Sequence, residues 1–187
     1  HALRDEMIAA RTKFKAKAAA GLVTDARTGE VVAMVSVPDY DANNPREALD
    51  PTRINRLTTG VFEMGSTFKL FTAAMALESG SSQLTSEYDA SAPIKIGRFT
   101  ISDYHGQKRT LSVSEIMVHS SNIGTYLLSQ RITSETLFNY FTAFGFGKKT
   151  ALNFPGETSG NVPDPSQWKG TEAVTVTYGY HYQASAF

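Results

Sequence analysis

The first residues that could do chemistry are Ser66 and Lys69, which stand three positions apart. A serine hydroxyl is a poor nucleophile near neutral pH and needs a neighbouring base. Positions i and i+3 share one face of a helix, so the Lys69 amine can reach the Ser66 hydroxyl. Apolar surroundings lower a lysine's pKa, because desolvation disfavours the charged ammonium. The pair is therefore a candidate for nucleophilic catalysis.

Ser120 and Asn122 form a second candidate pair. A hydroxyl there can relay a proton to a leaving amine, and the asparagine amide can orient a substrate peptide group. Neither pattern is specific, because the chain repeats Ser-x-x-Lys at Ser166 and Ser-x-Asn at Ser159. Those two copies lie in a polar stretch that predicts turns. Spacing alone leaves catalysis and chance about equally open.

The elements that must position these residues are three predicted helices. The first covers residues 65–80, with Ser66 in its N-terminal cap region and Gly80 as its stop. It is apolar on most faces, which predicts a buried helix with Ser66 at its mouth, near the positive end of the dipole. A second helix over 112–130 would carry Ser120 and Asn122, and a third over 134–144 would end at a glycine.

The other segments predict a mixed chain of helices and strands. Residues 1–17 have helical spacing and many basic residues, which predicts a helix at the N-terminal edge of the domain with a solvated charged face. Two β-rich runs within 20–37 predict a hairpin, and 173–178 is a further strand candidate. Residues 38–60 are rich in Pro, Asn and Asp and predict a long loop.

Two conspicuous groups of side chains have structural interpretations. The aromatic residues between 138 and 146 predict a core cluster rather than a ligand box. Glu157 follows a Pro-Gly pair, so we interpret it as a turn carboxylate rather than a deacylating base.

Composition limits the function classes. The 187 residues carry 18 basic and 18 acidic side chains and no cysteine. This balance argues against nucleic acid as a partner, because phosphate binding needs a concentrated basic surface. The four histidines lack metal-ligand spacing, so no metal or other cofactor is expected. The apolar stretches are far shorter than the roughly 20 residues of a membrane-spanning helix, and the charged start is unlike a signal peptide.

A longer pattern distinguishes Ser66 from chance. Residues 61–69 (VFEMGSTFK) closely resemble the active-site signature of the class B penicillin-binding proteins, the peptidoglycan D,D-transpeptidases. Further segments are similar to the same family, and several of them to its cell-division branch. These segments are 26–36, 54–56, 101–105, 119–124, 154–157 and 177–179.

The resemblance implies a fold and a reaction. The fold is of the α/β (α+β) class, the penicillin-recognising serine-enzyme fold, with an antiparallel sheet flanked by helices. The reaction cross-links septal peptidoglycan by acyl transfer from a D-alanyl-D-alanine stem peptide, and β-lactams would acylate the same serine. The implied roles are nucleophile for Ser66, general base for Lys69, proton shuttle for Ser120, and substrate binding for Asn122, Tyr178 and Gly179.

Partners and location follow from the same resemblance. Peptidoglycan stem peptides and their lipid-linked precursor would be substrates, and β-lactam antibiotics would be inhibitors. Divisome proteins and a membrane glycosyltransferase would be partners. The implied location is the periplasmic side of the bacterial inner membrane, with an N-terminal anchoring helix outside this sequence.

The chain departs from the family pattern in two places. The third motif, Lys-Ser/Thr-Gly, should follow the Tyr-Gly segment, and the nearest string, at 149–151 (KTA), comes too early. We interpret that string as solvated lysines beside a helix end. His181 stands where the family usually has glycine. We therefore expect residues 1–187 to be an incomplete transpeptidase domain that lacks its C-terminal part and is a poor catalyst alone.

Two alternatives remain open. Class D β-lactamases and β-lactam sensor domains also carry Ser-Thr-Phe-Lys, but their second motif ends in valine where this chain has Asn122. A non-catalytic fragment or binding module is the other alternative, and the absent third motif favours it. Labelling with a fluorescent penicillin separates the three.

Overall fold

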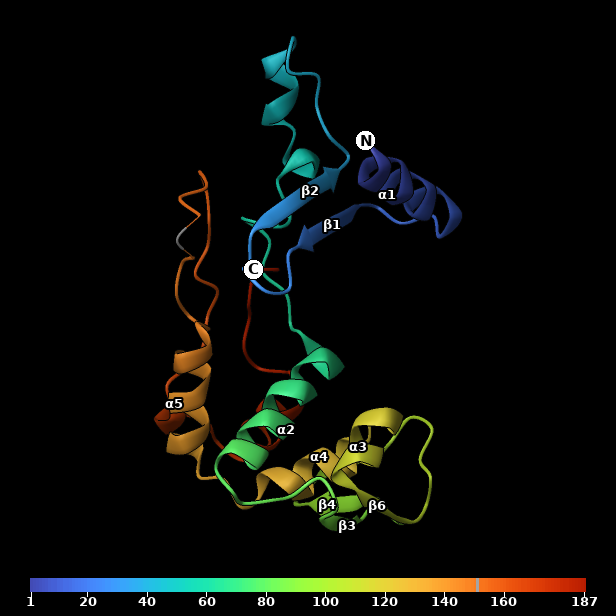
Figure 1. Cartoon of the computed structure of the whole chain (residues 1–187), viewed down its shortest axis with the longest axis vertical. Coiled ribbons are helices and arrows are strands. Elements are labelled where there is room, and N and C mark those ends of the chain that lie inside the picture. Colours follow the sequence, from blue (N-terminus) through green and yellow to red (C-terminus); the bar gives the residue numbers. More distant parts are fainter. Residues whose placement is uncertain (151) are drawn as a thin grey trace. The chain divides into compact units, whose positions relative to one another are not determined.

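The computed structural model describes residues 1–150 and 152–187, so the last residue of the string at 149–151 lies outside the described part (Figure 1). The chain divides into two compact units. The first unit comprises His1–Phe62, Lys149–Ser159 and Ser185–Phe187, and the second comprises Glu63–Lys148 and Gly160–Ala184. All six predicted site residues belong to the second unit.

The first unit is built on a hairpin and a helix. Strands β1 (Ala19–Thr24) and β2 (Val31–Val37) pair antiparallel, and helix α1 (Ala2–Lys13) contacts both (Figure 1). A β-carbon at Gly21 would lie 2.9 Å from Leu3 Cδ1, so glycine at this position allows the close approach of α1 to β1. The predicted helix and hairpin are both confirmed.

The segment after the hairpin is a loop with two short 3₁₀ helices, η1 (Pro45–Leu49) and η2 (Pro51–Arg53). Farther along the chain, a Glu157 carboxylate oxygen accepts a hydrogen bond from the Thr150 N–H at 2.5 Å. The Glu157 N–H donates to Phe154 O at 3.1 Å. Glu157 thus closes its own turn, as the sequence predicts.

In the second unit, the helix predicted over 65–80 begins as a 3₁₀ turn, η3 (Gly65–Phe68), and continues as α2 (Lys69–Glu78). It stops where Gly80 has φ +68° and donates to Leu77 O. The buried residues of α2 are Lys69, Thr72, Ala73, Met75 and Ala76. Leu70 differs from the expected core pattern, because 66% of it is exposed.

The single helix predicted over 112–130 is wrong, because two helices occupy that range. Helix α3 (Val113–His119) begins with a capping box between Ser112 and Glu115. It ends at Ser120, which has the left-handed backbone angles φ 50° and ψ 45°. Helix α4 (Asn122–Ser129) then starts under a new cap, the Ser121 hydroxyl. The Ser121 hydroxyl accepts from the Gly124 N–H and so starts a new helix, since a serine hydroxyl can compete for backbone N–H groups.

The strand predicted over 173–178 is also wrong. The segment forms α6 (Glu172–Thr175) and the 3₁₀ turn η5 (Val176–Tyr178), and it ends at Gly179, φ +98°. Its β-branched residues favour a strand locally. However, the Thr175 hydroxyl donates to the carbonyl four residues back and the Thr177 hydroxyl to the carbonyl three residues back, which suits helical backbone.

The remaining elements are α5 (Ser134–Phe144), η4 (Pro165–Gln167) and two short two-stranded sheets. Helix α5 stops before Gly145, as predicted, and the Thr133 hydroxyl caps its start. Strand β3 (Glu87–Asp89) pairs with β6 (Thr110–Ser112), and β4 (Ile94–Ile96) pairs with β5 (Phe99–Ile101), all antiparallel. Helices with antiparallel strands agree with the predicted α+β class. No helix in the described ranges is long and apolar enough to cross a membrane.

An aromatic cluster lies at the centre of one core. This agrees with the prediction for Phe141 and Phe146, whereas Phe144 is 48% exposed and lies outside the core. Phe68 and Phe141 are fully buried, and their ring centroids lie 4.7 Å apart in an edge-to-face arrangement. Phe146 and Tyr182 contact the same pair. Phe68, which directly precedes Lys69, is thus anchored in this core.

Replacing Phe141 with alanine should lower the free energy of unfolding by about 3–5 kcal/mol, because a buried ring leaves a cavity. Phe144 on the same helix is 48% exposed and provides a matched control. Its replacement should cost about 1 kcal/mol. Urea unfolding followed by circular dichroism measures both, and equal losses would contradict a core centred on Phe141.

Candidate active site

Ser66 lies on the η3 turn that opens the helix, and its side chain is exposed. The Gly65 N–H donates to Gly179 O at 2.9 Å, which ties the start of this turn to the end of η5. The Ser66 carbonyl accepts from the Lys69 N–H, so the two residues share one helical turn. The hydroxyl of Ser66 is therefore presented outward on a turn that is held at both ends.

Lys69 is 3% exposed and reaches the break between α3 and α4. Its Nζ donates to Ser120 O at 2.6 Å and to Ser120 Oγ at 3.0 Å. Within the described ranges, no hydrogen bond joins Lys69 Nζ to the Ser66 hydroxyl. The structure thus joins Lys69 to Ser120, whose left-handed backbone turns both oxygen atoms to the amine.

The protonation of Lys69 is shifted toward the neutral amine. Burial lowers the pKa of Lys69 to about 8, while the negative charge of Asp103 raises it in part. The direction predicted from an apolar surrounding is confirmed. A lysine with this pKa has a usable fraction of free amine near neutral pH, as a general base requires.

Asn122 is the first residue of α4, and its side-chain amide is held in place. Nδ2 donates to Ser102 O at 3.0 Å. The neighbouring Asp103 accepts from Ser121 Oγ at 2.7 Å and from the Ile123 N–H at 3.0 Å. The residue types and spacing in the sequence do not point to a role for Asp103. It stands 18 residues from Ser121, so no local spacing pattern links the two.

Gly179, which directly follows η5, contacts the Ser66 turn through Gly65, and Tyr178 precedes it as a core residue. The Thr72 hydroxyl donates to Thr177 O at 2.5 Å and fixes η5 against α2. Tyr178 is buried, and this burial raises the pKa of its phenol to about 12, so the ring stays neutral. A side chain on Gly179 would lie 2.0 Å from Gly65 O, so only glycine fits there.

His181 departs from the glycine pattern and keeps a backbone conformation that favours glycine, with φ +65°. Its N–H donates to the Glu63 carboxylate at 3.1 Å, and its ring contacts the Thr175 hydroxyl. Glu63 lies three residues before Ser66, so His181 ties the two segments together a second time. These contacts offset part of the cost of the left-handed conformation.

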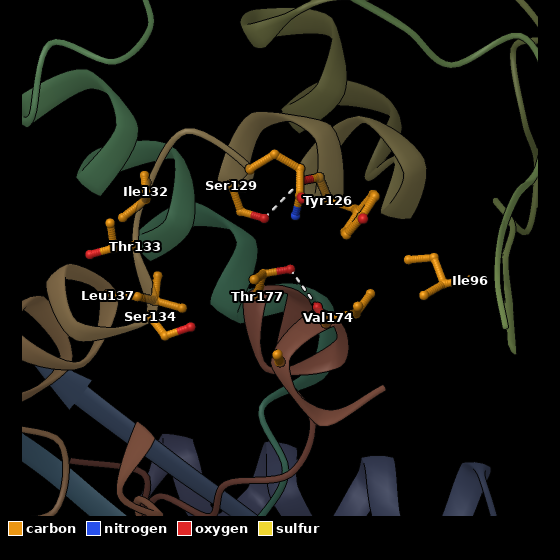
Figure 2. A pocket seen from close by; sticks show the side chains of 11 residues that line it. Ile96, Tyr126, Ser129, Ile132, Thr133, Ser134, Leu137, Val174 and Thr177 are labelled. Atoms are coloured by element: carbon orange, nitrogen blue, oxygen red, sulfur yellow. Dashed lines mark hydrogen bonds between the residues drawn. The ribbon is translucent and has the colours of Figure 1, made fainter. Parts of the chain in front are cut away.

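A separate pocket of about 320 Å³ lies between α4, α5 and the α6–η5 segment (Figure 2). Figure 2 shows that the hydroxyls of Ser129 and Thr177 lie at this pocket and donate to backbone carbonyls of their own helices. Thr177 directly precedes Tyr178, but the six predicted site residues are not among those that line the pocket.

In chemical terms, the site combines an exposed hydroxyl, a buried amine with a lowered pKa, and a second hydroxyl in contact with that amine. An amine of this kind can accept a proton from a nucleophile, and the second hydroxyl can pass a proton on. Asn122 stands two residues after Ser120, on the first turn of α4. This set suits covalent acyl transfer.

Comparison with known proteins gives consistent results. The family model described as "Penicillin binding protein transpeptidase domain" matches residues 19–187. The chain is 41% identical to a probable peptidoglycan D,D-transpeptidase FtsI of Caulobacter vibrioides, covering 96% of this chain and 30% of that protein. It is 40% identical to a probable peptidoglycan D,D-transpeptidase PenA of Neisseria flavescens, covering 97% and 45%. It is 34% identical to the peptidoglycan D,D-transpeptidase FtsI of Escherichia coli, covering 89% and 28%.

Two solved structures share the architecture. A crystal structure described as a peptidoglycan glycosyltransferase from Burkholderia ambifaria matches with a TM-score of 0.85 and 33% identity, covering 97% of this chain and 53% of that one. The apo TP domain of Burkholderia pseudomallei penicillin-binding protein 3 matches with a TM-score of 0.83 and 31% identity, covering 97% and 50%. The chain spans less than half the length of the three curated relatives.

Proposed function

The chain belongs to the penicillin-binding protein transpeptidase domain family, and from this premise we propose that it performs serine acyl transfer in peptidoglycan cross-linking. The resemblance stated from the sequence and the predicted fold are both confirmed at the level of the family. The observation that carries the proposal is the buried Lys69 amine in contact with Ser120, one helical turn after the exposed Ser66.

In the proposed reaction, Ser66 Oγ attacks the carbonyl carbon between the two D-alanines of a stem peptide. The Ser66 proton passes to the neutral Lys69 amine. Lys69 returns a proton through the Ser120 hydroxyl to the nitrogen of the departing D-alanine, which their 3.0 Å contact favours. The acyl group remains on Ser66 until the amine of a neighbouring peptidoglycan strand attacks its carbonyl carbon. The attacking amine loses a proton to Lys69, and the bond to Ser66 Oγ breaks, with a proton returned to that oxygen.

Substrate positioning falls to the two segments that flank Ser66. Asn122 would orient the donor peptide amide, and Tyr178 with Gly179 would line the other side of the Ser66 turn. The Ser66 backbone N–H at the start of η3 would stabilise the developing oxyanion. A β-lactam would enter the same site and acylate the same serine.

The wider setting of the reaction belongs to the same proposal. Substrates would be peptidoglycan stem peptides and their lipid-linked precursor, used at the septum. Divisome proteins and a membrane glycosyltransferase would act with the full-length protein. That protein would work on the periplasmic side of the inner membrane, anchored by an N-terminal helix.

Fluorescent penicillin tests the proposal directly. We expect covalent labelling of the chain, reduced by about 10³-fold or more in Ser66→Ala, because the nucleophile is gone. Ser166→Ala removes the serine of the other Ser-x-x-Lys string and should label like the unmodified chain. Label that is rapidly released would indicate a β-lactamase, and absence of label would indicate a non-catalytic binding module.

Labelling should also depend on pH with a definite sign. The neutral Lys69 amine is the active form, so the rate is lost as pH falls through the Lys69 pKa of about 8. We expect an increase of about tenfold per pH unit below pH 7 and a plateau above about pH 8.5. Labelling rates measured at constant ionic strength between pH 6 and 9.5 check this, and a flat profile would contradict Lys69 as the base.

A further inference from the structure

We propose that Asp103 is a positioning residue of this site: its carboxylate binds the start of α4 and so holds the Ser120–Asn122 turn in place. The inference rests on the proposed acyl transfer and adds a residue to it. Asp103 touches neither Ser66 nor the amine through a hydrogen bond in the described part of the chain. It acts through the residues between them.

Both carboxylate oxygens of Asp103 bind the start of α4. Oδ2 accepts from Ser121 Oγ at 2.7 Å, and Oδ1 accepts from the Ile123 N–H at 3.0 Å. Ser121 Oγ in turn accepts from the Gly124 N–H at 2.9 Å. The first turn of a helix has unpaired N–H groups, and a carboxylate is a strong acceptor for them. Asp103 therefore completes the cap that Ser121 begins.

This cap has a consequence for Ser120, the residue directly before it. Ser120 has a left-handed backbone, which costs a non-glycine residue roughly 1 kcal/mol or more. The conformation persists only where neighbouring contacts hold it. Asp103 provides such a contact one residue away, and the left-handed turn is what brings both Ser120 oxygens to Lys69 Nζ.

The segment that carries Asp103 also holds the substrate-binding asparagine. Ser102 O, one residue earlier, accepts from Asn122 Nδ2. Strand β5 ends at Ile101, which is 1% exposed and anchors the segment in the core. Residues 102 and 103 thus bind three consecutive residues of the α4 start: Ser121, Asn122 and Ile123.

The charge of Asp103 has a separate effect. Desolvation lowers the pKa of Lys69, and Asp103 is the charged group that opposes this shift. Without the negative charge, the ammonium form would lose its stabilisation and the amine would titrate at lower pH. Loss of the Asp103 hydrogen bonds should lower the plateau rate, whereas loss of its charge should shift the Lys69 midpoint. Variants that keep the charge can be compared with one that removes it.

The experiment compares Asp103→Asn, Ser121→Ala and Asp103→Glu in the whole chain. The Lys69 titration midpoint is read by NMR of the ¹³Cε atom in ¹³C-lysine-labelled protein, with Lys69→Arg identifying the signal. The plateau rate of penicillin labelling is measured alongside. The NMR midpoint does not depend on reaction with penicillin. A chain that does not react with penicillin therefore contradicts the proposed function, while the midpoint still tests the effect of Asp103 on Lys69.

We expect Asp103→Asn to move the midpoint to lower pH and to reduce the plateau rate about tenfold to hundredfold, because Ser120 is displaced. Ser121→Ala keeps the charge, so only the plateau should fall. Asp103→Glu should also keep its midpoint near that of the unmodified chain and lose plateau rate. Asp89→Asn is the matched control, since Asp89 caps a turn at Ser91 in the same unit, and it should change neither quantity.

An unchanged plateau rate in folded Asp103→Asn overturns the positioning role, and an unchanged midpoint overturns the effect of the Asp103 charge on Lys69. If that variant does not fold, Asp103→Glu decides, and an unchanged plateau in Asp103→Glu overturns the positioning role. Thermal unfolding of each variant shows which case applies.

Discussion

Replacing Lys69 with methionine is expected to reduce the rate of Ser66 acylation by about 10²–10⁴-fold, the usual contribution of a general base. Methionine has a similar length and no amine, so the nucleophile loses its proton acceptor while the buried position stays filled. The Ser120 oxygens lose their donor, which should cost about 1–3 kcal/mol of stability. Removal of a buried charge offsets part of this cost.

Time courses of fluorescent penicillin labelling measure the effect. Lys169→Met is the matched control, because Lys169 is the lysine of the other Ser-x-x-Lys string and lies in an exposed segment. It should label at the rate of the unmodified chain. A Lys69→Met variant that keeps its labelling rate would show that another group accepts the Ser66 proton.

Replacing Gly179 with alanine is expected to have the second large effect. The new methyl group would lie 2.0 Å from Gly65 O and 2.6 Å from Gly65 N, so η5 and the Ser66 turn must separate. The hydrogen bond from the Gly65 N–H to Gly179 O would then be lost. We expect a loss of about 2–4 kcal/mol in stability and about a hundredfold loss in labelling rate, because the nucleophile is misplaced.

Gly145→Ala isolates the close approach from the backbone strain. Gly145 has φ +97° against +98° for Gly179, but nothing lies within 4 Å of the position its side chain would take. This control should cost only the left-handed penalty of roughly 1–2 kcal/mol and leave labelling unchanged. Equal losses in the two variants would mean that contact with Gly65 is unimportant.

Much of the local structure was predictable from the sequence because its signals lie within one or two helical turns. Periodicity and glycine positions predict the hairpin at β1 and β2, the helix α5 with its Gly145 stop, and the helical segment that carries Ser66 and Lys69. The family followed from the string at 61–69, whose residue types are specific in combination.

Two errors came from the same source. The β-branched residues of 173–178 favour a strand, and the apolar stripe of 112–130 favours one long helix. Both expectations consider only near neighbours. Burial among helices turned the first segment into α6 and η5. The second segment breaks at Ser120, whose oxygens bind Lys69, and restarts under the Ser121 cap.

By itself the sequence determined which residues could react: a serine and a lysine on one turn, and a Ser-x-Asn pair elsewhere. Only the tertiary structure decided how they meet. Lys69 binds Ser120 across 51 residues, and Asp103 binds Ser121 across 18. Local propensities depend on neighbours a few positions away, whereas these contacts arise when separate elements pack together, so no spacing rule could reveal them.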